Sequence, residues 1–173
     1  GLDVVSNRIK EKSAAVQMME DMKDETAQIL SVKKEKKKVQ PPKLYDLTTL
    51  QREANRLLGF TAQQTLDYTQ SLYEKKLVTY PRTDSQYLTD DMEENAFLVV
   101  GAVNSMFPEM SIKGSEPDIK RLLNSKKVSD HHAIIPTVEI ANTDLKALPG
   151  GEKEILKLIA SKLLYASEQE YIY

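Results

Sequence analysis

Two helix-start signals with a glycine between them limit the fold of this chain more than any other feature. Thr48-x-x-Gln51 and Thr61-x-x-Gln64 both have the form of a capping box, in which a hydroxyl and an amide side chain satisfy free backbone N–H groups where a helix begins. Gly59 fits the left-handed conformation that ends a helix. The spacing predicts one helix that ends at Gly59 and a second over residues 62–75, joined by a very short turn.

The apolar residues of these two segments predict which faces are buried. Residues three or four apart lie on the same side of a helix. The predicted inward positions are Leu50, Ala54, Leu57 and Leu58 in the first helix and Ala62, Leu66, Thr69 and Tyr73 in the second. Helix pairs with so short a turn are common in all-α domains, so the pair alone does not indicate a function.

Further helices are predicted on both sides of this pair. Residues 8–23 carry apolar residues, many of them methionine, near a 3.6-residue period typical of a packed face. Asp90-x-x-Glu93 has the form of a cap for a helix over residues 91–106. A short helix is expected near residues 118–123. The last strong signal is a helix over residues 152–168, with inward positions at Ile155, Ile159, Leu163 and Ala166.

Little β-structure is expected. Residues 26–39 show weak alternation that fits one or two strands, and residues 77–80 form a short extended segment because the residue before Pro81 avoids the helical region. Pro41-Pro42 stops regular structure and marks a boundary, and residues 108–118 form a loop. The sequence therefore predicts a mainly α fold with a small β contribution near the N-terminus.

Composition excludes several classes of protein. The chain has 173 residues, 40% of them hydrophobic and 29% charged, which is ordinary for a soluble globular protein. Its longest apolar run, residues 96–103, is far shorter than the ~20 residues of a membrane span, and no leader for export is recognised. The absence of cysteine excludes disulfides, thiol catalysis and cysteine-ligated zinc, and fits a reducing, cytoplasmic setting.

The net charge of −2 argues against binding to nucleic acid through bulk charge. Charge is nevertheless uneven, since residues 31–43 hold six lysines and one glutamate. A solvated strand edge is the favoured interpretation of this run, and contact with phosphate is the alternative.

A tyrosine and an arginine lie two residues apart in the segment YPRTDS, residues 80–85. In extended backbone, Tyr80 and Arg82 point to the same side, and an arginine can bind phosphate oxygens or stabilise charge that develops on them. Asp84 or Ser85 is predicted to cap a following helical turn, whose N–H groups also favour an anion. The alternative is a packed tyrosine and an arginine ion-paired to Asp84.

The only two histidines, His131 and His132, are adjacent in the segment SDHHAIIPT, residues 129–137. Neighbouring side chains in extended backbone point apart, so at most one of them shares a site with Tyr80. A histidine there can bind phosphate or transfer a proton near neutral pH, or it can cap a loop. No ligand spacing for a metal accompanies the pair.

Three segments together resemble the type IA DNA topoisomerases, most closely bacterial topoisomerase III. They are LYDLTTLQREANRLLGFTAQQTL (44–66), LYEKKLVTYPRTDS (72–85) and SDHHAIIPT (129–137), in the order of that family. The resemblance implies that Tyr80 is the nucleophile that becomes linked to the 5′-phosphate of a cleaved strand. It implies that Arg82 positions or stabilises the scissile phosphate and that His131 contacts the same region, whereas His132 lies at a position that the family varies.

The resemblance also implies what lies outside this chain. The family's metal-binding TOPRIM domain supplies a catalytic glutamate and a D-x-D-x-E triad that binds Mg²⁺, and this spacing does not occur here. The expected partners are single-stranded or negatively supercoiled DNA and the TOPRIM and gate domains of the same polypeptide, with no membrane. The expected organisation is a partial gate domain over residues 1–40, a helical tyrosine-bearing domain over 41–171, and the start of a return strand at 172–173.

Two other functions stay open at this point. The helix pair could make the chain a non-enzymatic nucleic-acid-binding module. Alternatively, the chain could be a protein-interaction module in which Tyr80 is structural. Neither explains why the tyrosine and histidine segments occur together.

Overall fold

The computed structural model describes residues 10–23, 26, 29, 31–33, 38–110 and 116–172. The chain divides into two compact units, Gly1–Lys36 and Lys37–Tyr173. In the first unit, helix α1 (Lys12–Asp21) lies within the predicted helix, whose residues 8 and 9 fall outside the described part. No residue of α1 is buried in the described part of the chain, so its methionines are not part of a core there.

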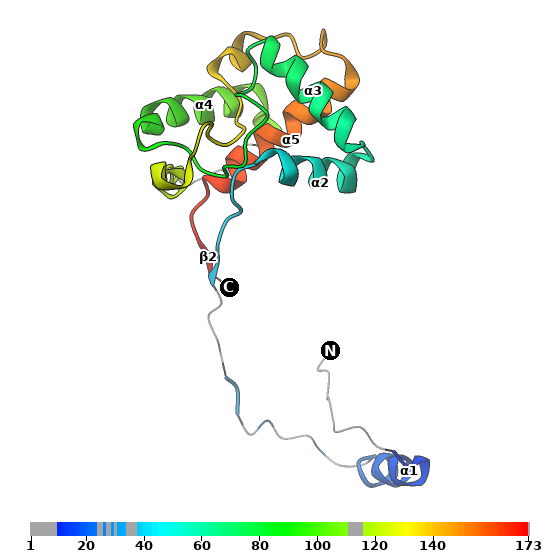
Figure 1. Cartoon of the computed structure of the whole chain (residues 1–173). Helices are drawn as coiled ribbons and strands as arrows, with labels where there is room; N and C mark the ends of the chain where they lie inside the picture. Colours follow the sequence, from blue (N-terminus) through cyan, green and yellow to red (C-terminus); the bar gives the residue numbers. More distant parts are fainter. Residues whose placement is uncertain are drawn as a thin grey trace. The chain divides into compact units, whose positions relative to one another are not determined.

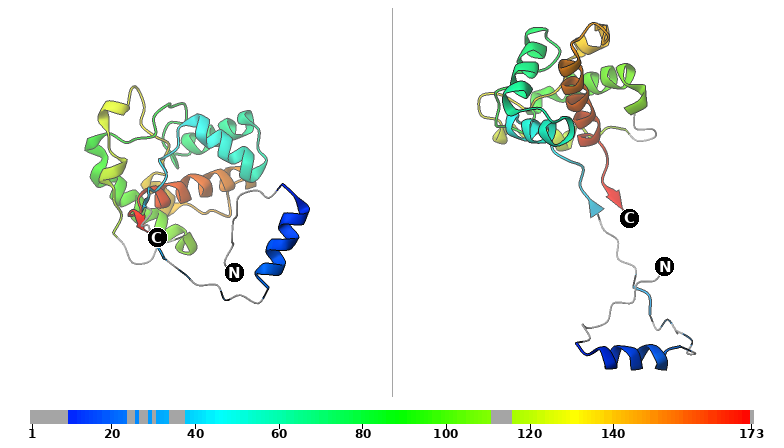
Figure 2. Two further views of the ribbon diagram at one scale, coloured as in Figure 1. Left: turned by 90° about the horizontal axis from the view of Figure 1, so that it is seen from below. Right: turned by 90° about the vertical axis from the view of Figure 1, so that its right-hand side faces the viewer.

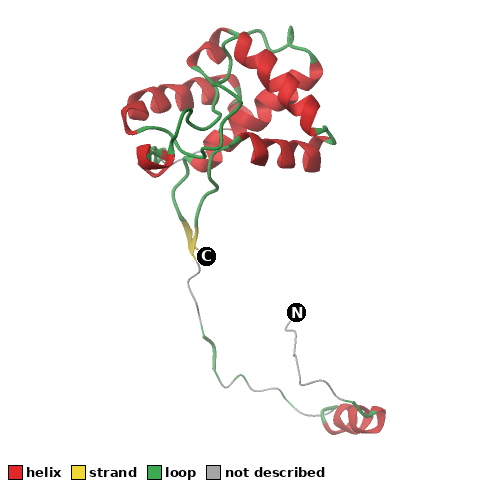
Figure 3. Cartoon of the chain, in the orientation of Figure 1, coloured by secondary structure: helices red, strands yellow, loops and turns green. Residues whose placement is uncertain are grey.

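The second unit is mainly helical, as predicted (Figure 3). Its longer elements are β1 (Lys38–Val39), α2 (Leu47–Leu58), α3 (Ala62–Glu74), α4 (Glu93–Met106), α5 (Gly150–Ala166) and β2 (Tyr171–Ile172). Short 3-10 helices lie between them: η1 (Asp90–Met92), η2 (Pro108–Met110), η3 (Lys120–Leu122), η4 (Ser125–Lys127) and η5 (Val138–Asn142).

Helix α2 begins two residues earlier than predicted, because Asp46 and not Thr48 is its cap. The Asp46 carboxylate accepts from the Thr49 N–H at 2.7 Å, and the Thr49 hydroxyl oxygen accepts from the Asp46 N–H at 3.2 Å. An aspartate three residues before a threonine thus forms the reciprocal pair that was assigned to Thr48 and Gln51. Gln51 instead donates to the Ala62 carbonyl across the turn.

The turn and the start of α3 match the prediction. The Thr61 hydroxyl accepts from the Gln64 N–H at 3.1 Å, and the Gln64 side-chain carbonyl accepts from the Thr61 N–H at 2.9 Å. Gly59 has a φ of +71°, the left-handed conformation expected of it.

The buried faces of α2 and α3 match the predicted faces only in part. Leu50 and Ala54 are fully buried, but 51% of Leu57 is exposed. In α3 the buried residues are Thr65, Thr69 and Leu72, so only Thr69 of the predicted face is among them. The two threonines tolerate burial because each hydroxyl donates to a backbone carbonyl one turn earlier, which satisfies the polar group within the helix.

Helix α5 packs against α2, α3 and α4 at the centre of the second unit (Figures 1 and 2). Its inward residues are those predicted, since Ile155, Ile159, Leu163 and Ala166 are all fully buried. Near its N-terminus the buried Glu152 carboxylate accepts from the Ser71 hydroxyl at 2.9 Å and pairs with Lys75. These contacts fix α3 on α5.

The segment before α4 differs from its prediction, because Asp90 does not cap a helix. Thr89 precedes η1 without a side-chain cap, and η1 continues into α4. The expected loop starts with η2, its residues 111–115 lie outside the described part, and η3 falls within the short helix expected near 118–123.

Strands β1 and β2 form an antiparallel pair, with Lys38 opposite Ile172 and Val39 opposite Tyr171. Lys38 also forms an ion pair with Glu170 at 3.1 Å. Residues 27, 28, 30 and 34–37 of the predicted strand region lie outside the described part, and lysines 34, 36 and 37 are among them. Within the described residues, no helix combines the length and hydrophobicity required to cross a lipid bilayer.

Candidate active site

The tyrosine and histidine segments run antiparallel, side by side. Leu77 leaves α3 after Lys76, whose positive φ of 62° turns the chain, and Val78 bridges to Pro136. The Thr79 N–H donates to the Ile135 carbonyl at 2.9 Å. The extended segment predicted for residues 77–80 is therefore present, and its partner is the histidine segment.

Two threonine hydroxyls hold these segments together. Thr79 Oγ1 donates to the Ala133 carbonyl at 3.0 Å and accepts from the Ile135 N–H at 3.0 Å. Thr83 Oγ1 donates to the His131 carbonyl at 2.7 Å. These bonds lie on either side of Tyr80 and fix the backbone of His131 relative to it.

The half-buried ring of Tyr80 lies between two other rings. The centroid of the His131 ring is 4.3 Å away, and the Tyr73 ring meets that of Tyr80 edge-on at 5.4 Å. The Tyr73 contact was not predicted, because helical spacing placed that residue on the buried face of α3, whereas 39% of it is exposed. No signal in the sequence marks Tyr73 as a neighbour of Tyr80.

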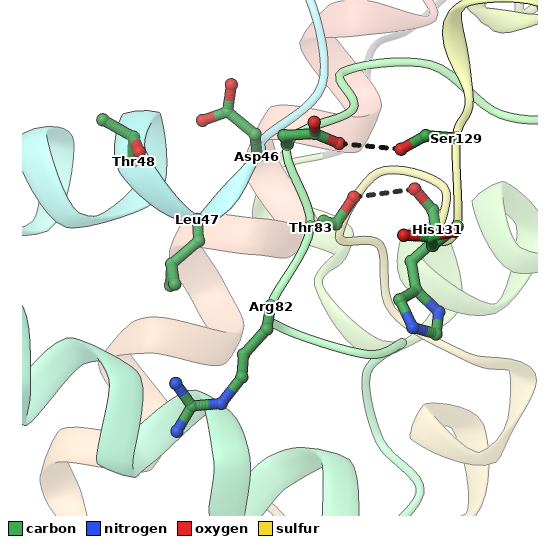
Figure 4. Close-up of a pocket in the computed structure, with 9 residues that line it drawn as sticks. Asp46, Leu47, Thr48, Arg82, Thr83, Ser129 and His131 are labelled. Carbon is green, nitrogen blue, oxygen red and sulfur yellow. Dashed lines mark hydrogen bonds between the residues drawn. The ribbon is translucent and has the colours of Figure 1, made fainter.

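Arg82 and His131 line one hollow of about 430 Å³ next to this contact (Figure 4). Both residues are exposed, and they project from the two adjacent segments with Thr83 between them. The remaining lining residues are Asp46, Leu47, Thr48, Asp84, Ser129 and Asp130. His131 thus connects the two other predicted residues, since it touches the ring of Tyr80 and lines the hollow together with Arg82.

Arg82 does not form the ion pair with Asp84 that the alternative interpretation required, as judged from the described residues. Asp84 instead accepts a hydrogen bond from the Ser129 hydroxyl at 3.2 Å. The guanidinium of Arg82 therefore has the exposure and the free charge to bind an anion in the hollow.

The predicted helical turn after Asp84 or Ser85 is wrong. Residues 82–86 are irregular, and the Ser85 hydroxyl donates to the Lys127 carbonyl at 2.9 Å. The helix terminus at the hollow is that of α2, where the Leu47 N–H donates to the Thr83 carbonyl at 3.0 Å. Because Asp46 caps this terminus, its negative charge offsets the positive end of the helix.

The second histidine faces a different environment. His132 Nδ1 is 2.9 Å from the Ala133 carbonyl oxygen. A hydrogen bond from Thr89 lowers the pKa of Asp91, and the nearby His132 ring adds to this effect. The two histidines therefore have separate neighbours, and His131 is the one beside Tyr80.

The described residues do not include a group of three or more His, Asp or Glu side chains that could hold a metal ion. Asp90, Asp91 and Glu93 lie in η1 and at the start of α4 and do not converge on a site. The donor set present in this part of the chain therefore does not fit Mg²⁺.

Comparison with known proteins identifies the family. The sequence profile of the DNA topoisomerase family matches residues 3–173. DNA topoisomerase 3 of Bacillus licheniformis is 40% identical over 164 residues, which cover 88% of this chain and 21% of that protein. DNA topoisomerase 3 of Bacillus subtilis is 37% identical over 159 residues, with coverage of 85% and 21%. This chain spans about a fifth of the length of these relatives.

A solved structure shares the fold. Full-length topoisomerase I from Thermotoga maritima superposes with a TM-score of 0.56 at 24% identity, covering 98% of this chain and 27% of that one. The profile match over almost the whole sequence agrees with the resemblance that the three motifs indicated. The chain belongs to the type IA DNA topoisomerase family.

Proposed function

We propose that this chain is the tyrosine-bearing part of a DNA topoisomerase that cleaves one DNA strand, passes another strand through the break and reseals it. The names of the relatives support this activity, and their length supports a larger polypeptide around the chain. The substrate is single-stranded or negatively supercoiled DNA, in the bacterial cytoplasm.

The observation that carries the proposal is the contact between Tyr80 and His131 at the edge of the hollow that Arg82 also lines. A free tyrosine has a pKa of ~10, so its oxygen needs cationic groups nearby to act as a nucleophile. Arg82 supplies one such group, and the imidazole of His131, a side chain that can bind phosphate, lies in the same small region. A phosphate in the hollow would meet both of them beside the Tyr80 ring.

The reaction exchanges one phosphate ester for another. The Tyr80 phenolic oxygen attacks the phosphorus, the bond to the 3′-oxygen breaks, and the strand is left with a 3′-hydroxyl and a 5′-phosphotyrosine. The phenol loses a proton and the leaving oxygen gains one. Attack by the 3′-hydroxyl reverses every bond change, so the break reseals without ATP.

We assign Arg82 to binding and charge stabilisation at the scissile phosphate, because a guanidinium binds phosphate oxygens through two parallel N–H bonds. His131 is assigned to the same phosphate and, through its ring contact, to the orientation of Tyr80. Both are proposed to act on charge that develops in the transition state.

We further propose that residues 41–171 form the domain that carries the cleaved 5′ end, with residues 1–40 as part of the gate domain and 172–173 as the start of its return strand. Mg²⁺ and the catalytic glutamate are assigned to the TOPRIM domain of the same polypeptide, outside these 173 residues. The chain alone is therefore expected not to relax DNA.

The test compares two matched substitutions in the full-length protein that carries this segment. With an oligonucleotide that traps the cleaved strand, the wild type is expected to form a covalent adduct whose tryptic peptide contains Tyr80. Tyr80→Phe abolishes the adduct, whereas Tyr73→Phe, which removes a hydroxyl from the neighbouring ring, retains it. An adduct that persists in Tyr80→Phe overturns the proposal. Binding without any adduct in the wild type would favour the non-enzymatic module.

A further inference from the structure

A second cationic group surrounds Tyr87, a residue that the proposed reaction does not use. The Lys43 ammonium lies 5.5 Å from the centroid of the Tyr87 ring, and the Lys127 ammonium lies 4.8 Å from it. Lys127 Nζ is also 3.5 Å from the Tyr87 hydroxyl oxygen. Two positive charges from distant parts of the sequence are thus gathered around one phenol.

The side chains of Lys43, Tyr87 and Lys127 all extend from backbone that packing or hydrogen bonds hold in place. Lys43 precedes the fully buried Leu44, and Arg121 donates to the Pro41 carbonyl at 3.1 Å just before it. The Tyr87 carbonyl accepts from the Ala133 N–H at 2.9 Å. The Lys127 carbonyl accepts from the Ser85 hydroxyl. The cationic group is therefore built into the fold.

This arrangement concentrates positive charge without neutralising it. Among the described residues, no carboxylate lies within 4 Å of the Lys43 or Lys127 ammonium, although five ion pairs involve other side chains. Burial alone would raise the pKa of Tyr87, but its hydrogen bonds with Lys127 and Lys43 outweigh that effect and lower it. The phenol thus reports a positive local potential, which an anion would relieve.

A cavity of about 250 Å³ opens beside this group, lined in part by Lys43, Gln86 and Tyr87. The Gln86 amide, the phenol and the Lys43 ammonium can all donate to an oxyanion there, whereas Lys127 contacts the phenol without lining the cavity. The volume suffices for a phosphate group, and the donors suit its several oxygens better than a single carboxylate.

The position of the group indicates which phosphate it binds. The segment from Thr83 to Tyr87 runs beside the segment from His131 back to Lys127, joined by the Thr83–His131 and Ser85–Lys127 hydrogen bonds. Four extended residues span at most ~13 Å, so the cationic group lies close to the Arg82–His131 hollow. A strand with one phosphate in that hollow can reach Tyr87 with another.

We propose that Lys43, Tyr87 and Lys127 form a second phosphate-binding site, which holds the backbone of a single DNA strand next to the part bound at the Arg82–His131 hollow. The assignment rests on the proposed function only for the identity of the strand. It also gives the last lysine of the 31–43 run a contact with phosphate, which was the less favoured interpretation of that run.

The test measures binding of a fluorescein-labelled oligothymidylate to the 173-residue chain by anisotropy, at several salt concentrations. Each phosphate contact contributes about 0.7 to the slope of log affinity against log salt for single strands, which corresponds to about eightfold in affinity at 50 mM salt relative to 1 M. Lys43→Ala and Lys127→Ala are each expected to weaken binding several-fold and to reduce the slope. Lys126→Ala removes the adjacent exposed lysine, which is not among the lysines in contact with the Tyr87 ring. This control variant is expected to keep the affinity and the salt slope of the wild type.

Equal losses of affinity in Lys126→Ala and Lys127→Ala would overturn the proposed site, because they would show that DNA responds only to the overall positive charge of this surface. So would unchanged binding in the Lys43 and Lys127 variants, no binding by the wild-type chain, or competition by a polyglutamate peptide as strong as by unlabelled oligonucleotide. Circular dichroism of each variant verifies that it is folded. The assay involves no cleavage, so failure of the full-length protein to form an adduct would leave this result unaffected.

Discussion

The ring of Tyr80 lies against the ring of His131, with 4.3 Å between their centroids and an angle of 43° between their planes. The two residues come from segments far apart in the sequence, and the hydrogen bonds of Thr79 and Thr83 bring those segments together. An imidazole in this position restricts where the phenol ring can lie and is itself close enough to contact a phosphate bound beside that ring.

His131→Ala is expected to slow strand cleavage by about 100-fold or more, the usual cost of losing a group that stabilises developing charge. His132→Ala is the matched control, since that ring faces Ala133 and Asp91, and its rate should stay close to that of the wild type. Rates are measured in the full-length protein as formation of covalent adduct under single-turnover conditions. Equal rates in the two variants would remove His131 from the proposed site.

Thr83→Val tests whether the link between the two segments matters for the reaction. The change keeps the shape of the side chain but removes the donor to the His131 carbonyl and the acceptor for the Ser85 N–H. We expect the free energy of unfolding to fall by about 1–2 kcal/mol and cleavage to slow by a larger factor than that loss of folded protein explains.

Ser129→Ala provides the comparison, because it removes a hydroxyl that lines the same hollow and whose hydrogen bond, among the described residues, is to the Asp84 carboxylate. Its unfolding free energy and its cleavage rate should both stay close to wild type. Thermal denaturation of the chain and adduct formation by the full-length protein measure the two effects. A Thr83→Val protein that is fully active would show that His131 is positioned by other contacts.

Local chemistry explains which parts of the fold could be predicted from the sequence. The Thr61–Gln64 cap, the left-handed Gly59 and the buried face of α5 depend on residues within a few positions of one another, and each matched. The predicted Thr48–Gln51 cap was wrong because the pair Asp46–Thr49 overlaps it and can cap the same helix. The carboxylate of Asp46 is a stronger hydrogen-bond acceptor than the hydroxyl of Thr48.

Features that depend on tertiary contact could not be predicted in this way. The period of α3 did not reveal that Thr65 would be buried, because a threonine can satisfy its hydroxyl within its own helix. The turn expected after Asp84 is absent because Thr83 and Ser85 bond to the segment of residues 127–131. The same segment brings His131 to Tyr80, a proximity that only the family resemblance implied.

Two glycines within helices should respond in opposite ways to alanine. Apart from its chain neighbours and the backbone of its own helix, a Cβ at Gly101 of α4 meets nothing within 4 Å, so Gly101→Ala is expected to stabilise the chain by about 0.5–1 kcal/mol through helix propensity. A Cβ at Gly151 of α5 would overlap the ring of Tyr68, which packs edge-on against Phe60 at 5.3 Å.

Gly151→Ala therefore forces the Tyr68 ring to move and should destabilise the chain by about 1–3 kcal/mol. Urea denaturation followed by circular dichroism compares both variants with the wild type. Stabilisation by Gly151→Ala would mean that the Tyr68 ring can leave its place against α5 and Phe60 without cost.

Spectrophotometric titration tests the environment of Tyr87 directly. Because the pKa of its phenol is lowered in the folded state, Tyr87 should ionise before the pH reaches ~10, the ordinary tyrosine value. Tyr45 cannot cause this early step, since burial raises its pKa. Absorbance of tyrosinate should therefore show an early transition that is lost in Tyr87→Phe, shifted upward in Lys127→Ala and retained in Lys126→Ala.

The lowered pKa of Tyr87 also determines how the free energy of unfolding changes with pH. Between the folded pKa of Tyr87 and ~10, the unfolded chain binds more protons than the folded chain, so this residue adds stability as pH rises and its contribution is complete above ~10. The difference in unfolding free energy between the wild type and Tyr87→Phe should accordingly grow over that interval. A difference that shrinks as pH rises would mean that the lysines do not stabilise the phenolate, and the positive potential inferred around Tyr87 would have to be abandoned.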